Sequence, residues 1–325
     1  MAWYALARLL QALAVLAVMS LLVFAGVYAL GNPVDLLVDP NAGAADYARR
    51  VAALGLDQPL WVQYARFVVG LLHGDLGNSF VHGTPALHLI FERMPATLEV
   101  SFAALMMALA SGVPLGLVAG FKPQSWIGRA IRALSVLGFS LPTFWVGLMF
   151  IMLFAVELGW LPAGGRGPTE HVLGIDLSIT TLEGWRHLLL PAVNLALFKI
   201  SLLIRLTAAS TQEILRQDYI RFARAKGLHP VRIVGLHVLK NALVPIVTVL
   251  GLEFGSLVAF AVVTESVFAW PGMGKLLIDS ITLLDRPVVV AYLLVVVLLF
   301  VSINFIVDLL YGLLDPRVRL GGAQA

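Results

Sequence analysis

The chain has 325 residues, of which 60% are hydrophobic and only 13% are charged, and its mean hydropathy is +0.92. Soluble domains carry about 25% charged residues, because a wetted surface must surround the core. The composition therefore excludes a soluble enzyme, a disordered chain and a fibrous repeat, and it predicts an integral membrane protein. Cysteine is absent, which excludes disulfides and thiolate metal sites.

Six stretches are apolar for about 20 residues, the length with which an α-helix crosses the hydrocarbon core. In chain order they cover approximately 9–30, 99–120, 134–156, 188–207, 243–264 and 288–313. We therefore expect an all-α protein with six transmembrane helices. The first run is longer than the roughly 7–15 residues of a signal-peptide core, so we expect it to be retained. The intervening segment 31–98 is polar and rich in turn residues, which predicts an aqueous loop.

Lys and Arg are distributed unevenly among the loops between these spans. With a cytoplasmic N-terminus, the inner segments carry a net charge of +9 and the outer segments −6. Because cytoplasmic loops are enriched in Lys and Arg, both termini are predicted to be cytoplasmic. We expect three regions: 1–98 with the first helix and a large periplasmic loop, 99–314 with a five-helix transmembrane domain, and 315–325 as a cytoplasmic tail.

The predicted cytoplasmic loop 208–241 contains a helical pattern that ends abruptly. Leu215, Tyr219, Phe222 and Lys226 recur at helical spacing, which predicts one stripe with an apolar ridge. Gly227 and the proline three residues later predict a stop, with the glycine in a left-handed conformation. We interpret this loop as a docking element for a cytoplasmic partner. The alternative is a solvated basic connector.

Two ionisable residues, Lys199 and Glu253, fall within predicted spans. Charged groups at such depth face protein or water, because exposure to lipid is costly. These two residues either line a translocation pathway or form a structural ion pair. Gly112, Gly116 and Gly120 recur every four residues, which predicts a face where another helix approaches closely.

Enzyme motifs are not found. Residues 270–277 resemble a phosphate-binding loop, but Ala269 and Leu276 replace the glycine and the Ser or Thr that this motif needs. The histidines of the first outer loop lack metal-site spacing and are interpreted as surface residues. We therefore predict no catalytic, cofactor-binding or metal-binding residues. A self-contained secondary carrier or channel stays an alternative, although it would need no docking loop.

The segment DYIRFARAKGL at 218–228 resembles the coupling loop of permease subunits of bacterial ATP-binding-cassette (ABC) importers. Further segments resemble the dipeptide, oligopeptide and nickel branch, and most closely the first permease subunit of dipeptide transporters. They include LGLDQPLWVQY (54–64), HGDLGNSF (73–80), RMPATLEV (93–100), SLPTFWVG (140–147), LPAVNLAL (190–197), NALVPIVTVLGL (241–252), TESVFAWPGMG (264–274) and LLYGLLDPRVR (309–319).

This resemblance implies a type I ABC importer permease fold in the bacterial inner membrane. It also implies a second permease subunit, two cytoplasmic ATPases and an external solute-binding protein as partners, with no cofactor and no ATPase activity on this chain. Di- or oligopeptides are the implied cargo, with nickel or glutathione as the alternative. Ala223, Arg224, Ala225 and Gly227 match the small-residue and glycine positions of the coupling loop. Together with the helical pattern described above, we expect coupling to the ATPases through Leu215, Asp218, Tyr219, Phe222, Ala223, Arg224, Ala225, Lys226 and Gly227.

Overall fold

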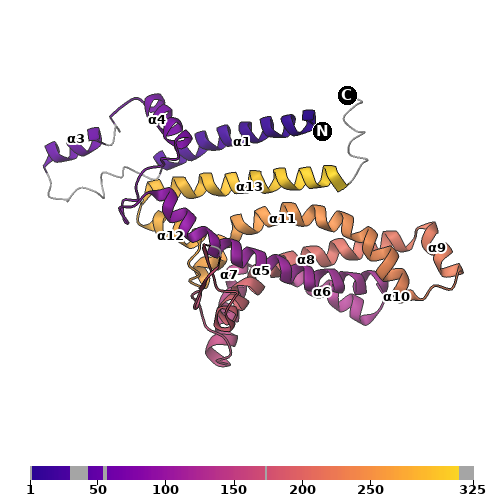
Figure 1. Ribbon diagram of the computed structural model, residues 1–325. Coiled ribbons are helices and arrows are strands. Elements are labelled where there is room, and N and C mark those ends of the chain that lie inside the picture. The colour runs from indigo at the N-terminus through magenta and orange to yellow at the C-terminus, as the bar shows by residue number, and fades with distance from the viewer. Residues whose placement is uncertain (1, 30–42, 54–56, 173, 315–325) are drawn as a thin grey trace. The chain divides into compact units, whose positions relative to one another are not determined.

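The computed structural model describes residues 2–29, 43–53, 57–172 and 174–314 (Figure 1). The predicted cytoplasmic tail, 315–325, lies outside the described residues. The chain divides into two compact units: one comprises residues 1–95 and 271–325, and the other comprises residues 96–270.

The first unit is built from both ends of the sequence. Its helices are α1 (Ala2–Ala29), α3 (Ala44–Ala53), α4 (Leu60–Leu72), α12 (Met273–Thr282) and α13 (Arg286–Leu314), with the first residues of α5 (Ala86–Phe121). Helices α1 and α13 lie side by side and antiparallel (Figure 1). Val23 of α1 packs with Val290 and Leu294 of α13 in a small buried cluster. The connection before α5 is fixed to the start of α13, because Asp285 accepts hydrogen bonds from the Ser79 hydroxyl and the Phe80 N–H.

The second unit holds the rest of α5 and the elements that follow it as far as α11. These are α6 (Trp126–Ser140), α7 (Thr143–Phe150), the π-helix η1 (Ile151–Glu157), strands β1 (Glu170–Val172) and β2 (Ile175–Leu177), α8 (Leu182–Leu215), α9 (Asp218–Ala225), α10 (Pro230–Arg232), the π-helix η2 (Ile233–Leu239) and α11 (Lys240–Val267). The strands pair antiparallel, with Glu170 opposite Leu177. This hairpin is the one departure from an all-α fold among the described residues.

Helix α8 is the centre of this unit and packs against α6, α7 and α11. Its close approach to α5 depends on the predicted glycine face. A Cβ atom at Gly112, Gly116 or Gly120 would lie 2.8, 2.5 or 2.6 Å from the Cβ atoms of Leu203, Thr207 and Thr211, respectively. Real Cβ atoms do not approach so closely, so a side chain at these positions would force the helices apart. The predicted packing face is therefore confirmed.

Over the described residues, the six predicted spans fall in helical regions, but the third is not a single helix. Within 134–156, α6 ends at Ser140 and the chain resumes as α7 after a bend of 105°. Leu141 is extended, with φ −85° and ψ 135°, and precedes Pro142. Proline disfavours helical geometry in the residue before it, which explains the break.

Among the described residues, four helices are long and apolar enough to cross a membrane, and the bent pair of α6 with α7 and η1 would make a fifth. In α1 the described apolar stretch is Leu13–Gly26. These findings support a multi-pass membrane protein. Six spans with both termini in the cytoplasm stays a prediction.

Candidate functional site

Helix α9 is a short, separate helix that follows α8 after a two-residue break. Arg216 caps the end of α8, and Gln217 is extended, with φ −69° and ψ 148°. The acidic Asp218 lies in the first turn of α9 and the basic Arg224 in its last turn. Each charge therefore complements the helix dipole at its own end, which favours a helix even of this short length.

Gly227 ends α9 in the predicted conformation, with φ +76°. The Gly227 N–H donates to Arg224 O (2.9 Å), and the Leu228 N–H donates to Ala223 O (3.2 Å). These two bonds define a Schellman motif, which satisfies carbonyl groups at the helix end. A Cβ atom at Gly227 would meet nothing within 4 Å, so the requirement for glycine comes from the backbone angle and not from crowding.

The buried face of α9 consists of Ile220 and Ala223, which pack with Ile233 and Val238 of η2. Leu215, at the end of α8, packs against this same cluster. We predicted that Leu215 continues the exposed stripe of Tyr219, Phe222 and Lys226, and this prediction is wrong for Leu215. The break at Arg216 and Gln217 changes the helical phase, so Leu215 faces the cluster and does not continue the exposed ridge.

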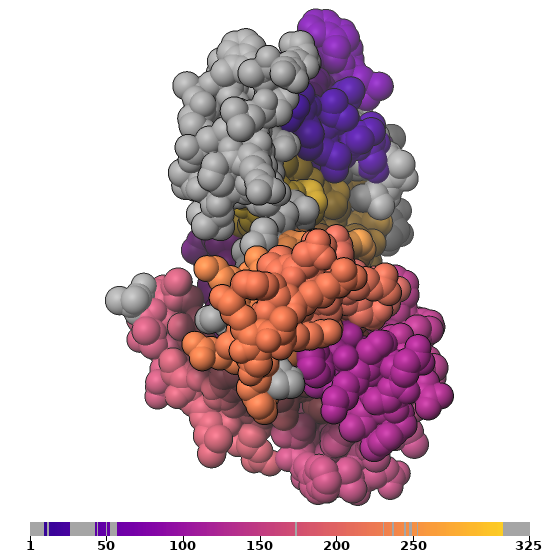
Figure 2. All heavy atoms as spheres, turned by 90° about the vertical axis from the view of Figure 1, so that its right-hand side faces the viewer, coloured from indigo at the N-terminus to yellow at the C-terminus, as the bar shows by residue number. Residues whose placement is uncertain are grey.

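Tyr219 and Phe222 are the apolar part of the exposed face of α9, with exposed fractions of 45% and 62%. The Lys226 Nζ lies 4.5 Å from the centroid of the Phe222 ring, and the Tyr219 hydroxyl accepts a hydrogen bond from Asn241 (3.2 Å). Arg224, Ala225 and Lys226 are also exposed. Figure 2 views this end of the second unit, where the orange segment that contains α9 is uncovered. We define Tyr219, Phe222 and Lys226 as the α9 patch.

Lys199 of α8 and Glu253 of α11 form an ion pair. Ser256 completes the group, because its hydroxyl lies 2.7 Å from Lys199 Nζ and 3.0 Å from Glu253 Oε2. The side chains of Lys199 and Glu253 are 10% and 26% exposed, respectively. Of the two alternatives considered for these residues, the structure contains the ion pair. A role in a translocation pathway stays a prediction.

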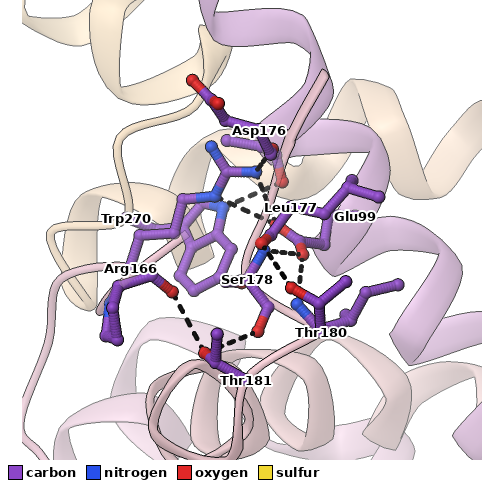
Figure 3. Close-up of polar contacts among 11 residues, drawn as sticks. Glu99, Arg166, Asp176, Leu177, Ser178, Thr180, Thr181 and Trp270 are labelled. Carbon is purple, nitrogen blue, oxygen red and sulfur yellow. Dashed lines mark hydrogen bonds and ion pairs between the residues drawn. The ribbon is translucent and has the colours of Figure 1, made fainter. Parts of the chain in front are cut away.

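A buried carboxylate, Glu99 of α5, organises a polar cluster that the sequence did not reveal (Figure 3). Its side chain is 1% exposed and accepts two bonds from Arg166, at 3.0 Å from Nε and 2.7 Å from Nη2. The backbone N–H groups of Ser178 and Ile179 donate to its other oxygen at 2.7 and 2.8 Å. Both carboxylate oxygens are therefore satisfied although water is excluded.

Arg166 in turn donates to the carbonyl of Asp176 in β2 at 2.5 Å, and its guanidinium lies 6.0 Å from the centroid of the Trp270 ring. Trp270 is fully buried and donates from its indole N–H to Ala96 O at 2.9 Å. Glu99 and its partners thus anchor the connection between η1 and α8 onto α5. The sequence shows only an acidic residue at the edge of a predicted span, and its partners are distant in the chain.

The comparisons with known proteins agree with this architecture. The sequence model described as "Binding-protein-dependent transport system inner membrane component" matches residues 112–320, and its N-terminal companion model matches residues 1–101. The chain belongs to this family. It is a permease subunit of an ABC importer and a multi-pass protein of the inner membrane. Membership of this family excludes the alternative of a self-contained carrier or channel.

Relatives of this permease align over nearly the whole chain. The Di/tripeptide transport system permease protein DppB of Pseudomonas aeruginosa is 42% identical over 89% of this chain and 90% of its own length. The probable D,D-dipeptide permease DdpB of Escherichia coli K12 is 43% identical, with 90% of each chain covered. The dipeptide permease DppB of the same strain is 38% identical over 92% of this chain and 94% of its own.

Among solved structures, an inward-facing form of the MetNI methionine ABC transporter has a TM-score of 0.55 to this permease. The match has 20% sequence identity and covers 70% of this chain and 96% of that chain. At this identity the likeness concerns the fold alone. It supports the ABC permease fold that the sequence predicts.

Proposed function

We propose that this permease forms half of a translocation pathway for di- or oligopeptides. Its proposed partners are a second permease subunit, two cytoplasmic ATP-binding subunits that carry the ATPase activity, and an external solute-binding protein. The peptide cargo is supported by the names of the three relatives above, which refer to dipeptides or tripeptides. Nickel or glutathione is the alternative cargo within the same importer type.

The observation that carries the coupling role is the α9 patch. Exposed aromatic residues beside a basic side chain, on a helix outside the predicted spans, favour docking into a cleft of another protein. We propose that closure of the ATPases pushes on this patch. The α9 core of Ile220 and Ala223 passes that displacement to η2, which continues directly into α11. The loop 208–241 is the coupling loop in this proposal, and 99–314 is the transmembrane domain.

The test is ATP-dependent uptake of a labelled dipeptide by the complete importer in proteoliposomes. Gly227→Val places a β-branched residue where φ is positive, at a cost of roughly 1–2 kcal/mol or more. We expect the turn to open, uptake to fall to a small fraction of the wild-type rate, and the ATPases to co-purify less well. Phe222→Asp should do the same by placing a charge in the proposed contact.

Gly26→Val in α1 is the matched control, because Gly26 also has open space around its Cβ position, has no positive φ and lies outside the coupling loop. It should transport nearly as well as wild type. Normal uptake and normal ATPase retention in both test variants would remove the coupling role. ATP-dependent uptake of nickel without uptake of peptide would instead remove the cargo assignment and leave the coupling role intact.

A further inference from the structure

Helix α4 is an apolar helix that the protein leaves largely uncovered. It has no buried residue, and it exposes Leu60 (60%), Trp61 (74%), Val69 (54%) and Leu72 (79%). Its 13 residues include a single charged residue, Arg66. Such a helix is unexpected in the aqueous loop that the sequence predicts for 31–98, because water would surround four large apolar side chains.

The residues of α4 fall into three sectors around the helix axis. Tyr64, Phe67 and Leu71 form the packing sector, which contacts α1 and α13. Trp61, Ala65, Val69 and Leu72 follow one another at about one turn and form a continuous exposed apolar sector. The remaining sector contains Gln63, Arg66 and Gly70. A helix with one packed side, one apolar side and one polar side has the pattern of a helix at an interface between lipid and water.

The packing partners of α4 show its depth along the first unit. The Tyr64 hydroxyl lies 3.0 Å from the Ser20 hydroxyl, and the Tyr64 ring packs edge-on against Phe24, with centroids 5.3 Å apart. Ser20 lies near the middle of the predicted span 9–30, so about 15 Å of apolar helix follow it. That distance is about half the thickness of the hydrocarbon core.

Helix α13 gives a second, independent measure of this depth. Phe67 and Leu71 pack against the buried cluster that contains Val290 and Leu294. Val290 and Leu294 lie inside the span Arg286–Val307, in its first turns. Leu21 and Leu22 of α1, which follow Ser20 directly, are also apolar and exposed.

From this geometry we infer that α4 is embedded in one leaflet of the bilayer, the one at the C-terminal end of α1, and that its exposed sector binds lipid acyl chains. The helix is too short to cross the membrane, since 13 residues extend only about 20 Å. Arg66, in the polar sector, has a long side chain that can extend its charge toward the headgroups. This inference depends on neither the cargo nor the coupling proposed above.

Because the chain has no cysteine, single cysteines can carry nitroxide spin labels in the full-length protein. We choose Val69 and Leu72 on the exposed sector, and measure collisions with oxygen, which partitions into lipid, and with a water-soluble nickel chelate. The measurement is made in nanodiscs, with the permease alone and within the complete importer. Leu21 on α1 is the lipid control, and exposed His82 is the aqueous control.

We expect the ratio of oxygen to nickel accessibility at Val69 and Leu72 to match that at Leu21 and to exceed that at His82 several-fold. A ratio like that at His82 would place α4 in water and overturn the inference. Labels that both reagents fail to reach would mean that a protein partner covers the sector, which also overturns it. As a check without substitutions, a photoactivatable phospholipid should crosslink to residues 60–72 of the wild-type protein, and an absence of such crosslinks counts against lipid contact.

Discussion

At the residue scale, the carboxylate of Glu99 has more partners than any other single group described above. It receives Arg166 and two backbone N–H groups in a site with almost no exposure to solvent. Removing one member of such a buried pair leaves the other charge uncompensated, which costs roughly 3–5 kcal/mol. The anchor is therefore sensitive to a change of one atom.

We expect Glu99→Gln to loosen the connection between η1 and α8 by roughly 3–5 kcal/mol. The amide keeps one oxygen and replaces the other with an NH2 group, so either Arg166 or the two backbone N–H groups lose their acceptor, and the arginine loses its counter-charge in both cases. Hydrogen exchange of residues 170–181 should become much faster, and the thermal transition in detergent should fall.

Glu183→Gln is the control for this substitution. Glu183 also pairs with an arginine, Arg186, at 3.0 Å, but both side chains are about half exposed (48% and 47%). The loss should stay below about 1 kcal/mol. If Glu99→Gln and Glu183→Gln have equal effects, the buried network does not hold the connection.

Gly227 and Glu99 show what a sequence can reveal about single residues. The conformation of Gly227 could be predicted, because a Schellman motif depends on the few residues around the helix end. The role of Glu99 could not be predicted, because its partners lie 67 to 80 residues further along the chain. The ion pair of Lys199 and Glu253 could be predicted only in part. Burial of two opposite charges in spans suggested a pair, but only the packing of α8 on α11 brings them together.

At the scale of elements, hydrophobic length located the helices but not their breaks. The third predicted span continues through Leu141 and Pro142, where the structure bends by 105°. Composition is apolar on both sides of this point, so a hydropathy window does not register it. Helix α9 is a similar case. Its separation from α8 depends on the two backbone conformations at Arg216 and Gln217, which a pattern of apolar spacing does not specify.

The approach of α5 to α8 gives a prediction at this scale. In Gly116→Ala the new methyl group would lie 2.5 Å from the Thr207 Cβ and 2.9 Å from the Ile204 carbonyl oxygen. The backbone carbonyl cannot rotate away, so the helices must separate. We expect a loss of about 1–3 kcal/mol, the usual cost of overpacking, measured as a lower thermal transition in detergent.

Gly26→Ala in α1 is the matched control, since nothing lies within 4 Å of its Cβ position. Alanine is the better helix former by about 1 kcal/mol, so this variant should be at least as stable as wild type. Equal stability of the two variants would mean that the glycine face of α5 tolerates a side chain.

At the scale of the whole molecule, the orientation in the membrane is the main prediction still to be tested. Loops 31–98 and 157–187 are expected outside, and loops 121–133 and 208–241 inside, because of the Lys and Arg distribution. A membrane-impermeant maleimide should label a cysteine at His82 in intact cells. It should label a cysteine at Gln124 only after the membrane is permeabilised.

Both positions are exposed, whereas Ser79 is buried and bonded to Asp285 and would give an ambiguous result. The wild-type chain should remain unlabelled, since it has no cysteine. Labelling of the Gln124 variant, but not the His82 variant, in intact cells would reverse the assigned orientation.

The construction of one unit from both ends of the chain sets the order in which the protein can be completed during its synthesis. Val23 emerges early, but its packing partners Val290 and Leu294 are translated about 270 residues later. At ~5–20 residues per second, the first helix waits roughly 15–50 s for the last one. All of residues 96–270 are made during that interval. A ribosome that stalls before Arg286 therefore releases a chain whose middle is complete but whose first helix has no α13 to pack against.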